Sequence, residues 1–278
     1  MKKTIGQQGR KLWELCLYNR LWGSAAELTY YLLFAFFPFL MFLAGVFALI
    51  GGEQGNLFAR MLQFLPEAVQ KLLSDYSVHL YDMPGSTPLI LGAGMTLYSL
   101  TRAFHVLGFH VRRMYGRAGR RKTWVDVRQS GLFTVAFMVL ILLNFGLIVC
   151  GRFFLTLLDR FTLVSPAFLQ WLEIGRFVLP IVIGFLFVLQ LYRFLPGGGI
   201  TYRQALPGTI FCMLAWSGAT IGFSVYVNDF ARYSLLYGSV SAAIILVVWL
   251  NLSSVLLLFG AQLNGFLRKE KPRKSSGD

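Results

Sequence analysis

The sequence predicts an all-α, polytopic membrane protein with six transmembrane helices, amphipathic helices in its outer loops and both termini in the cytoplasm. Three observations predict this fold class. Six long apolar runs recur along the 278 residues, 56% of the residues are hydrophobic and only 14% are charged, and positive charge gathers on alternate connections between the runs. A water-soluble fold of this composition would leave too much apolar surface uncovered.

Each apolar run is close to the length of about 20 residues that a helix needs to cross a hydrocarbon core of about 30 Å. In chain order the expected spans are residues 25–50, 88–109, 130–150, 177–192, 206–227 and 239–266. The fourth run is the shortest, and Arg176 and Arg193 at its ends can snorkel to the membrane surfaces. We expect one membrane domain, 1–278, with a basic cytoplasmic N-terminal segment at 1–23 and a basic, disordered tail at 268–278.

The sorting of charge predicts the orientation. The formal net charge is +14, and the most basic connection joins the second and third spans, with Arg112, Arg113, Arg117, Arg120, Arg121, Lys122 and Arg128. Positive residues are retained on the cytoplasmic side during insertion. An even number of spans independently puts both termini on one side, which the charge identifies as the cytoplasm.

Two outer connections are too long and too apolar to be simple loops. Residues 51–87 and 152–171 carry apolar side chains at helical spacing, which predicts amphipathic helices at the outer interface. Two interpretations stay open for them. They cap something on the outer side, or they form a peripheral lid that only packs.

The basic connection at 112–128 has a second interpretation as a nucleic-acid site. Such a site requires aromatic residues for stacking, and only Tyr115 and Trp124 are interleaved with the cations. Topology and contact with anionic head groups explain the cations better. The expected partners are the bilayer, its anionic lipids and envelope proteins, without nucleic acid, and the oligomeric state is left open.

Charged residues inside the expected spans are costly in lipid and are therefore paired or functional. Glu27 and Arg102 lie at similar depth in the first two spans, near the cytoplasmic side. Because these spans are consecutive and antiparallel, we expect the two side chains to form an ion pair. The pair either locks two helices together or takes part in transport.

Uncharged polar residues recur within the other spans. Those expected in the bundle interior are Asn144, Gln190, Asn251, Ser254, Gln262 and Asn264. Hydrogen bonds between helices account for such residues without any substrate.

A second polar group lies at the outer junction of the last two spans. It consists of Asn228, Asp229, Arg232, Tyr233, Tyr237, Gly238 and Ser239. A helix that starts abruptly after Gly238 presents unpaired N–H groups that suit a phosphate or carboxylate. Tyrosines at this depth are also common interfacial anchors, so an anion-binding niche and simple anchoring both remain open.

No pattern in the sequence indicates an enzyme. The three histidines His79, His105 and His110 have no metal-ligand spacing. The Gly197–Gly199 turn is not followed by the Lys-Ser/Thr pair of a phosphate loop. We therefore expect neither a catalytic site nor a metal or cofactor.

Several short motifs resemble a known family. They are residues 25–31 (AAELTYY), 37–38 (FP), 191–196 (LYRFLP), 205–208 (ALPG) and 260–264 (GAQLN). In this order they resemble the signatures of the YihY/BrkB family of bacterial inner-membrane proteins. The resemblance implies six spans and the bacterial plasma membrane, and it brings no settled activity. Gln262 stands where the family often has Glu, and Arg112 stands where Asn is common.

These features favour a protein that transports or flips an amphipathic anionic substrate, such as an envelope lipid. An arginine-rich inner face, intramembrane charges and amphipathic outer segments motivate this hypothesis. The alternative is a membrane scaffold or assembly factor that transports nothing, favoured by the absence of the inverted repeats that many transporters show. The ribonuclease label that the family once carried (ribonuclease BN) has no support in these residues.

Overall fold

The computed structural model describes residues 5–51, 87–117, 123–160, 166–230 and 239–270, and every regular element within these ranges is a helix. The helices are α1 (Ile5–Tyr18), α2 (Leu21–Gly51), α5 (Thr87–Met114), α6 (Thr123–Arg160), α7 (Pro166–Phe194), α8 (Tyr202–Phe230) and α10 (Ser239–Glu270). The all-α fold class is confirmed for this part of the chain.

Six of these helices are long enough to cross a membrane. They range from 28 residues in α5 to 38 residues in α6, which corresponds to about 42–57 Å at 1.5 Å per residue. By length and composition, four contain a segment able to cross a membrane, namely Leu21–Leu43, Trp124–Asn144, Tyr202–Tyr226 and Ala243–Arg268. A shorter apolar segment, Val178–Phe194, lies in α7. In α5 the apolar sequence is interrupted by Arg102 and ends in Arg112 and Arg113.

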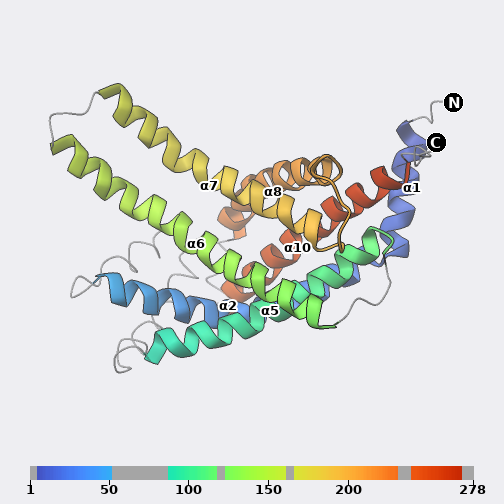
Figure 1. Ribbon diagram of the computed structural model, residues 1–278, viewed down its shortest axis with the longest axis horizontal. Helices are drawn as coiled ribbons and strands as arrows, with labels where there is room; N and C mark the ends of the chain where they lie inside the picture. Colours follow the sequence, from blue (N-terminus) through green and yellow to red (C-terminus); the bar gives the residue numbers. More distant parts are fainter. Residues whose placement is uncertain (1–4, 52–86, 118–122, 161–165, 231–238, 271–278) are drawn as a thin grey trace.

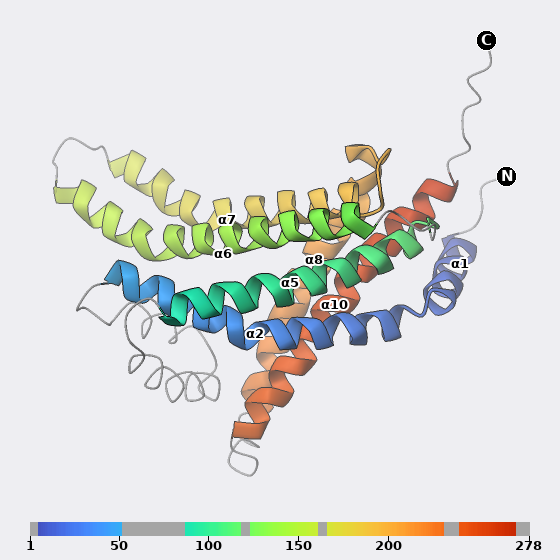
Figure 2. The same ribbon diagram turned by 60° about the horizontal axis from the view of Figure 1, so that its bottom comes forward.

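The long helices form a closed ring. Each described long helix packs on the next one along the chain, and α10 returns to pack on α2 and also on α5 (Figure 1). Figure 2 shows the α6–α7 pair lying over the α2–α5 pair, while α8 and α10 cross them at a steep angle. The short helix α1 lies at the end of the bundle where α10 ends.

Glycines allow α2 and α5 to pack with their backbones in close contact. A Cβ atom on Gly92 would lie 2.5 Å from the backbone nitrogen of Phe42, and one on Gly45 would lie 2.6 Å from the Cα atom of Leu89. Small residues at a helix crossing are the usual means of close approach in membranes, where packing replaces the hydrophobic effect as the driving force. These contacts fix the antiparallel register of the α2–α5 pair.

The crossing of α8 and α10 uses the same device. A Cβ atom on Gly208 would overlap the carbonyl oxygen of Gly260, and a Cβ atom on Gly260 would lie 2.5 Å from the hydroxyl of Tyr192. One on Gly265 would overlap the carbonyl oxygen of Met114, where α5 ends. The backbone of α10 therefore packs directly on α8 and on the end of α5.

Aromatic side chains hold α5, α6 and α7 together. The ring of Phe104 lies with its centroid 6.2 Å from that of Phe133, 5.9 Å from that of Phe137 and 6.1 Å from that of Phe187. Edge-to-face and offset contacts of this kind add about 0.5–1.5 kcal/mol per pair beyond area burial. This aromatic cluster thus lies where α5 and α7 pack against the first half of α6.

The N-terminal segment at 1–23 contains α1, which the criterion of a long apolar run does not detect because the helix has only 14 residues and is amphipathic. The chain turns from α1 into α2 at Arg20, whose φ of 52° is left-handed. At the other end of the chain, α10 continues to Glu270. The start of the predicted disordered tail, 268–270, is therefore helical, and residues 271–278 lie outside the described residues.

The described parts of the predicted outer segment at 152–171 belong to the ends of two long helices, and its place at the outer interface stays a prediction. There α6 continues without a break to Arg160, and α7 already begins at Pro166. Apolar residues at helical spacing fit the extension of a span as well as they fit a separate interfacial helix, and proline favours the first turn of a new helix. The other predicted segment, 51–87, lies almost entirely outside the described residues.

Candidate functional site

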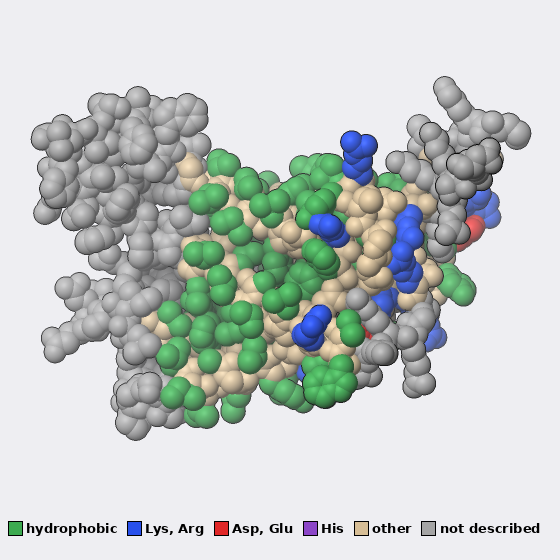
Figure 3. Space-filling view, viewed as in Figure 1, with side chains coloured by type: hydrophobic (Ala, Val, Ile, Leu, Met, Phe, Trp, Pro, Cys, Tyr) green, Lys and Arg blue, Asp and Glu red, His purple; other side chains and the backbone are tan. Residues whose placement is uncertain are grey.

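Most described cations lie at one end of the bundle, here called the basic end. It is formed by α1, the last turn of α5, the first turn of α6, the turn at 195–201 and the last turns of α10. Figure 3 shows Lys and Arg gathered toward this end, with hydrophobic side chains over the middle of the same face. The charge sorting expected from the sequence is therefore also a spatial separation.

The first cation of the predicted basic loop is committed to an ion pair. Arg112 at the end of α5 donates from Nη1 to Oδ1 of Asp126 over 3.0 Å, and its Nη2 lies 2.9 Å from Oδ2. The side chains are only 11% and 9% exposed. Two parallel hydrogen bonds between a guanidinium and a carboxylate give a strong, directional contact. Arg112 therefore fastens α5 to α6 rather than offering a free charge to lipid.

A second cation of that loop holds the glycine turn between α7 and α8. Arg117 donates to the carbonyl oxygen of Gly197 over 2.9 Å and also to that of Gly198. Gly197, Gly198 and Gly199 all have positive φ, between 68° and 88°, which L-residues with side chains rarely adopt. Burial, followed by the nearby charge of Arg268, lowers the pKa of Arg117 below its ordinary value.

Two further cations of the loop are described: Arg113 is half-buried and Arg128 is exposed. The other three, Arg120, Arg121 and Lys122, lie outside the described residues.

Glu27 is paired with a histidine. Its Oε2 lies 2.9 Å from Nε2 of His110, which is buried in α5, while the Glu27 side chain itself is about half exposed. Arg102 instead lies over the ring of Tyr98, with Cζ 5.8 Å from the ring centroid. The structure thus pairs Glu27 with His110 rather than with Arg102. The register of α2 and α5 places the two predicted partners about two helical turns apart, about 12 Å at 1.5 Å per residue.

The predicted polar residues near the end of α10 are fully buried and form hydrogen bonds to neighbouring segments. Gln262 accepts a 2.6 Å hydrogen bond from Nδ2 of Asn19, which follows α1. Asn264 accepts from the backbone N–H of Gly208 over 2.7 Å and donates to the carbonyl oxygen of Ala205 over 2.9 Å. A Glu at position 262 could accept the same hydrogen bond, so this departure from the family pattern keeps the acceptor.

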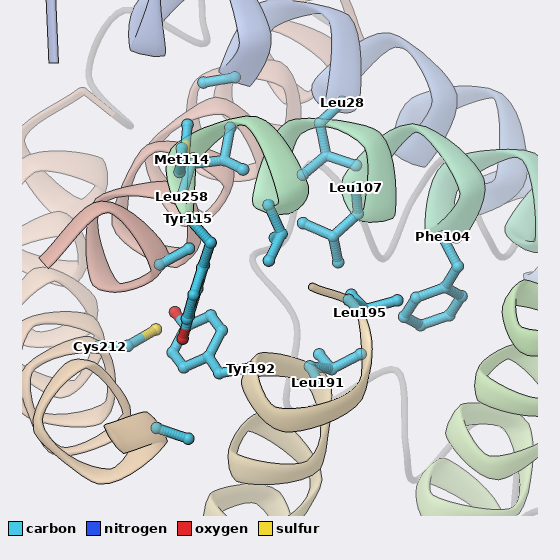
Figure 4. Close-up of a cluster of buried hydrophobic side chains, with 14 of the residues drawn as sticks. Leu28, Phe104, Leu107, Met114, Tyr115, Leu191, Tyr192, Leu195, Cys212 and Leu258 are labelled. Atoms are coloured by element: carbon cyan, nitrogen blue, oxygen red, sulfur yellow. The ribbon is translucent and has the colours of Figure 1, made fainter. Parts of the chain in front are cut away.

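Two buried tyrosines complete this packed region. Tyr192 donates from its hydroxyl to the carbonyl oxygen of Leu257 over 2.6 Å, and Figure 4 shows its ring beside Tyr115, with the sulfur of Cys212 near by. Burial raises the pKa of the Tyr115 hydroxyl above its ordinary value. Hydroxyls that stay protonated can serve as hydrogen-bond donors without adding charge to the core.

Polar residues deeper in the ring form smaller groups. Asn251 donates to Oγ1 of Thr29 over 3.3 Å, and the hydroxyls of Thr29 and Ser254 are 3.3 Å apart, which joins α2 to α10. Asn144 donates within its own helix to the carbonyl oxygen of Leu140 over 2.7 Å. The buried Oε1 of Gln190 meets no hydrogen-bond donor within the described part of the chain.

The predicted outer anion niche is not assembled from described residues. Asn228 and Asp229 lie in the last turn of α8, and Ser239 begins α10. The rest of the niche, Arg232, Tyr233, Tyr237 and Gly238, lies outside the described residues, so the niche stays a prediction.

Three residues of the basic end are absent from the site predicted from the sequence. Asn19, Asp126 and Tyr192 are buried and bonded to partners from other helices. Asp126 was detectable in principle, because an isolated acid in the first turn of a basic segment is placed to pair with a cation. Over the part of the chain that the structure describes, no three His, Cys, Asp or Glu side chains come together as a metal site would require.

Comparison with known proteins identifies relatives of the whole membrane region. A ribonuclease-like protein of Bacillus subtilis, YfkH, is 28% identical over 251 residues, which are 90% of both chains. UPF0761 membrane proteins of Xanthomonas oryzae pv. oryzae and Xanthomonas campestris pv. campestris are each 28% identical over 266 residues. The alignment covers 92% of this chain but only 59% of these Xanthomonas proteins. No solved structure matches the chain.

A family model matches nearly the whole chain. The model of the family described as "Virulence factor BrkB" matches residues 16–278, from the end of α1 through the last span. Together with the apolar helices of the described structure, this match shows that the chain belongs to the BrkB family of membrane proteins.

Proposed function

We propose that this protein crosses the bacterial plasma membrane six times, with the basic end in the cytoplasm, and moves an amphipathic, anionic substrate such as an envelope lipid from one leaflet to the other. Support for six spans comes from the six long helices, of which four already have the composition of a span. Support for the orientation comes from the gathering of cations at the end where α1 and α10 lie.

The observation that carries the proposal is the contact between two kinds of surface. Exposed apolar side chains cover the long helices, for example Leu132 and Ile221 at 68% and 70% exposure. Figure 3 shows this surface followed by Lys and Arg side chains toward the basic end, and Arg113, Arg128 and Arg268 lie near the helix ends that form it. An amphipathic anion fits such a boundary, because its head group contacts the cations while its acyl chains stay on the apolar surface.

One observation favours the alternative of a scaffold. The contacts of the basic end, Arg112 with Asp126, Asn19 with Gln262 and Asn264 with Gly208, fasten helices to one another through buried groups. A rigid end of this kind would suit a platform for other envelope proteins. In both roles the protein acts without catalysis, and the ribonuclease-like name of the Bacillus subtilis relative is not carried over to this chain.

Reconstitution distinguishes the two roles. The purified protein is placed in phosphatidylcholine vesicles that contain phosphatidylglycerol, together with a trace of either lipid bearing a fluorescent acyl chain. We expect the protein to bring labelled phosphatidylglycerol from the inner leaflet to a membrane-impermeant quencher faster than labelled phosphatidylcholine. Quenching no faster than in protein-free vesicles, for both lipids, would reject transport of lipid and favour the scaffold.

A further inference from the structure

Arg102, in the middle part of α5, has an exposed side chain that faces outward from the ring. The exposed residues of α5 recur every three or four positions, at Leu91, Met95, Tyr98 and Arg102, and again at Phe109. The buried face of α5 lies on the other side of the helix and packs on α2, α6 and the centre of the ring. Arg102 therefore stands on a stripe that is otherwise apolar and turned toward lipid.

The register of the neighbouring helices gives the depth of Arg102 in the membrane. The contacts of Glu27 with His110 and of Phe42 with Gly92 place Arg102 level with residues 32–35 of α2. The apolar run of α2 extends from residue 25 to residue 50, so this level lies on the cytoplasmic side of its middle.

The contacts of α5 with α6 give the same depth. The pairs Arg112–Asp126 and Thr101–Thr134 place Arg102 level with residues 133–136 of α6. The apolar run of α6 extends to residue 150, so these residues also lie on the cytoplasmic side of its middle. Arg102 is thus inside the hydrocarbon layer, in its inner half.

The guanidinium does not reach toward the basic end. Its Cζ lies 5.8 Å from the ring centroid of Tyr98, one turn closer to the start of α5 and further from the cytoplasmic side. The attraction of a cation to an aromatic ring is smaller than the cost of placing an arginine in the hydrocarbon layer. The described carboxylates Glu14, Glu27 and Asp126 pair with other residues.

A second copy of the chain does not supply the missing anion at this level. In a side-by-side dimer with both copies in the same orientation, Arg102 would meet residues of its own depth. Residues 32–35 and 133–136 are Leu, Leu, Phe and Ala, and Phe, Thr, Val and Ala, without a carboxylate. Within the described residues, neither this chain nor the facing levels of α2 and α6 in a second copy supply the anion, which points to the lipid itself.

We propose that Arg102 and Tyr98 bind the phosphate of an anionic lipid head group in the inner half of the membrane, as the lipid moves along the outer face of α5. The planar guanidinium matches a phosphate with two parallel hydrogen bonds. Water drawn in around a buried arginine lowers the barrier for a head group at the same depth. The apolar stripe of Leu91, Met95 and Phe109 accommodates the acyl chains on either side. This inference rests on the proposed function and gives it a route outside the ring.

The test compares Arg102→Gln and Arg102→Lys with wild type in the vesicle assay with labelled phosphatidylglycerol. Arg10→Gln is the control, because it removes an exposed arginine from α1, outside the apolar segments. We expect Arg102→Gln to move phosphatidylglycerol about tenfold more slowly, since a hydrogen bond between charged groups is lost. Arg102→Lys keeps the charge without the bidentate geometry and should fall between, while Arg10→Gln should match wild type.

The outcomes separate the inference from the function on which it rests. Wild-type protein that moves lipid, with Arg102→Gln equally fast, overturns this route and leaves the proposed function standing. Wild-type protein that moves neither lipid rejects both. Thermal unfolding of the purified variants gives an independent readout, because a structural Arg102 would make Arg102→Gln less stable, whereas removal of an uncompensated charge from lipid should leave its stability unchanged or higher. A change in oligomeric state on Arg102→Gln would assign Arg102 to an interface between copies and overturn the proposal.

Discussion

Gly208→Ala is expected to destabilise the protein by about 3 kcal/mol or more, the upper range for overpacked cores. The added methyl group would overlap the carbonyl oxygen of Gly260 and lie 2.5 Å from the side-chain nitrogen of Asn264. The first obstacle is backbone, and the second is a side-chain amide held in place by two hydrogen bonds to α8. Separation of α8 from α10 would also break the two hydrogen bonds that Asn264 makes to the backbone of α8.

The same helix offers a matched control for this substitution. Gly218 in α8 has open space where a Cβ atom would stand, and Gly→Ala in a helix interior is favourable by about 0.5–1 kcal/mol. Thermal unfolding in detergent, followed by the loss of the monodisperse peak in size-exclusion chromatography, compares the two variants. Equal stability of Gly208→Ala and Gly218→Ala would show that the α8–α10 crossing is not as close as the structure has it.

Asp126→Ala is expected to cost about 3–5 kcal/mol, because it leaves the buried guanidinium of Arg112 without its carboxylate. Only 11% of the Arg112 side chain is exposed, so water cannot replace the lost partner. The double variant Arg112→Gln/Asp126→Asn removes both charges together and should recover much of the stability.

The control for this pair is the exposed one in α1. Arg10 and Glu14 lie 3.2 Å apart, but their side chains are 83% and 60% exposed. Glu14→Gln should therefore change stability by less than about 0.5 kcal/mol, the usual value for a surface pair in a helix. If Asp126→Ala were as mild as Glu14→Gln in the unfolding measurement, Arg112 and Asp126 would not be fastening α5 to α6.

The positions of the long helices could be predicted because an apolar run is a property of one segment. The expected spans at 25–50, 88–109 and 130–150 all lie within single helices of the structure. Helix ends were harder to predict. The sequence at 152–160 has no residue pattern that would end a helix, and α6 continues through it to Arg160. The amphipathic α1 is too short to appear as a span.

The polar interior was predicted by residue type but not by partner. Gln262, Asn264 and Asn251 are buried or half-buried, as expected of polar residues in a bundle. Their partners Asn19, Gly208 and Thr29 come from helices more than 50 positions away in the chain. A single sequence does not show which helix lies beside which, so these contacts could not be derived from it.

Glu27 and Arg102 show how an error in the expected register of α2 against α5 changes an interpretation. Both residues were correctly placed inside helices of an antiparallel pair. The glycine contacts of α2 with α5 shift the expected pairing by about two turns, and Glu27 meets His110 instead. This shift is what leaves Arg102 facing lipid and makes it informative about function.

The claim on which the account depends is the orientation of a six-span protein with its basic end in the cytoplasm. Single cysteines, introduced one at a time into a variant without native cysteines, report the side of the membrane. At the basic end the reporters are the exposed residues Gln7 and Thr201. On the opposite side they are Glu53 and Asp159, in the connections expected outside.

A membrane-impermeant maleimide is applied to the cytoplasmic membrane of spheroplasts and, as the control for reactivity, to the same membrane after permeabilisation. We predict that cysteines at positions 53 and 159 are labelled in intact spheroplasts and that those at positions 7 and 201 are labelled only after permeabilisation. Labelling of position 7 or 201 in intact spheroplasts would contradict the six-span, N-in and C-in arrangement.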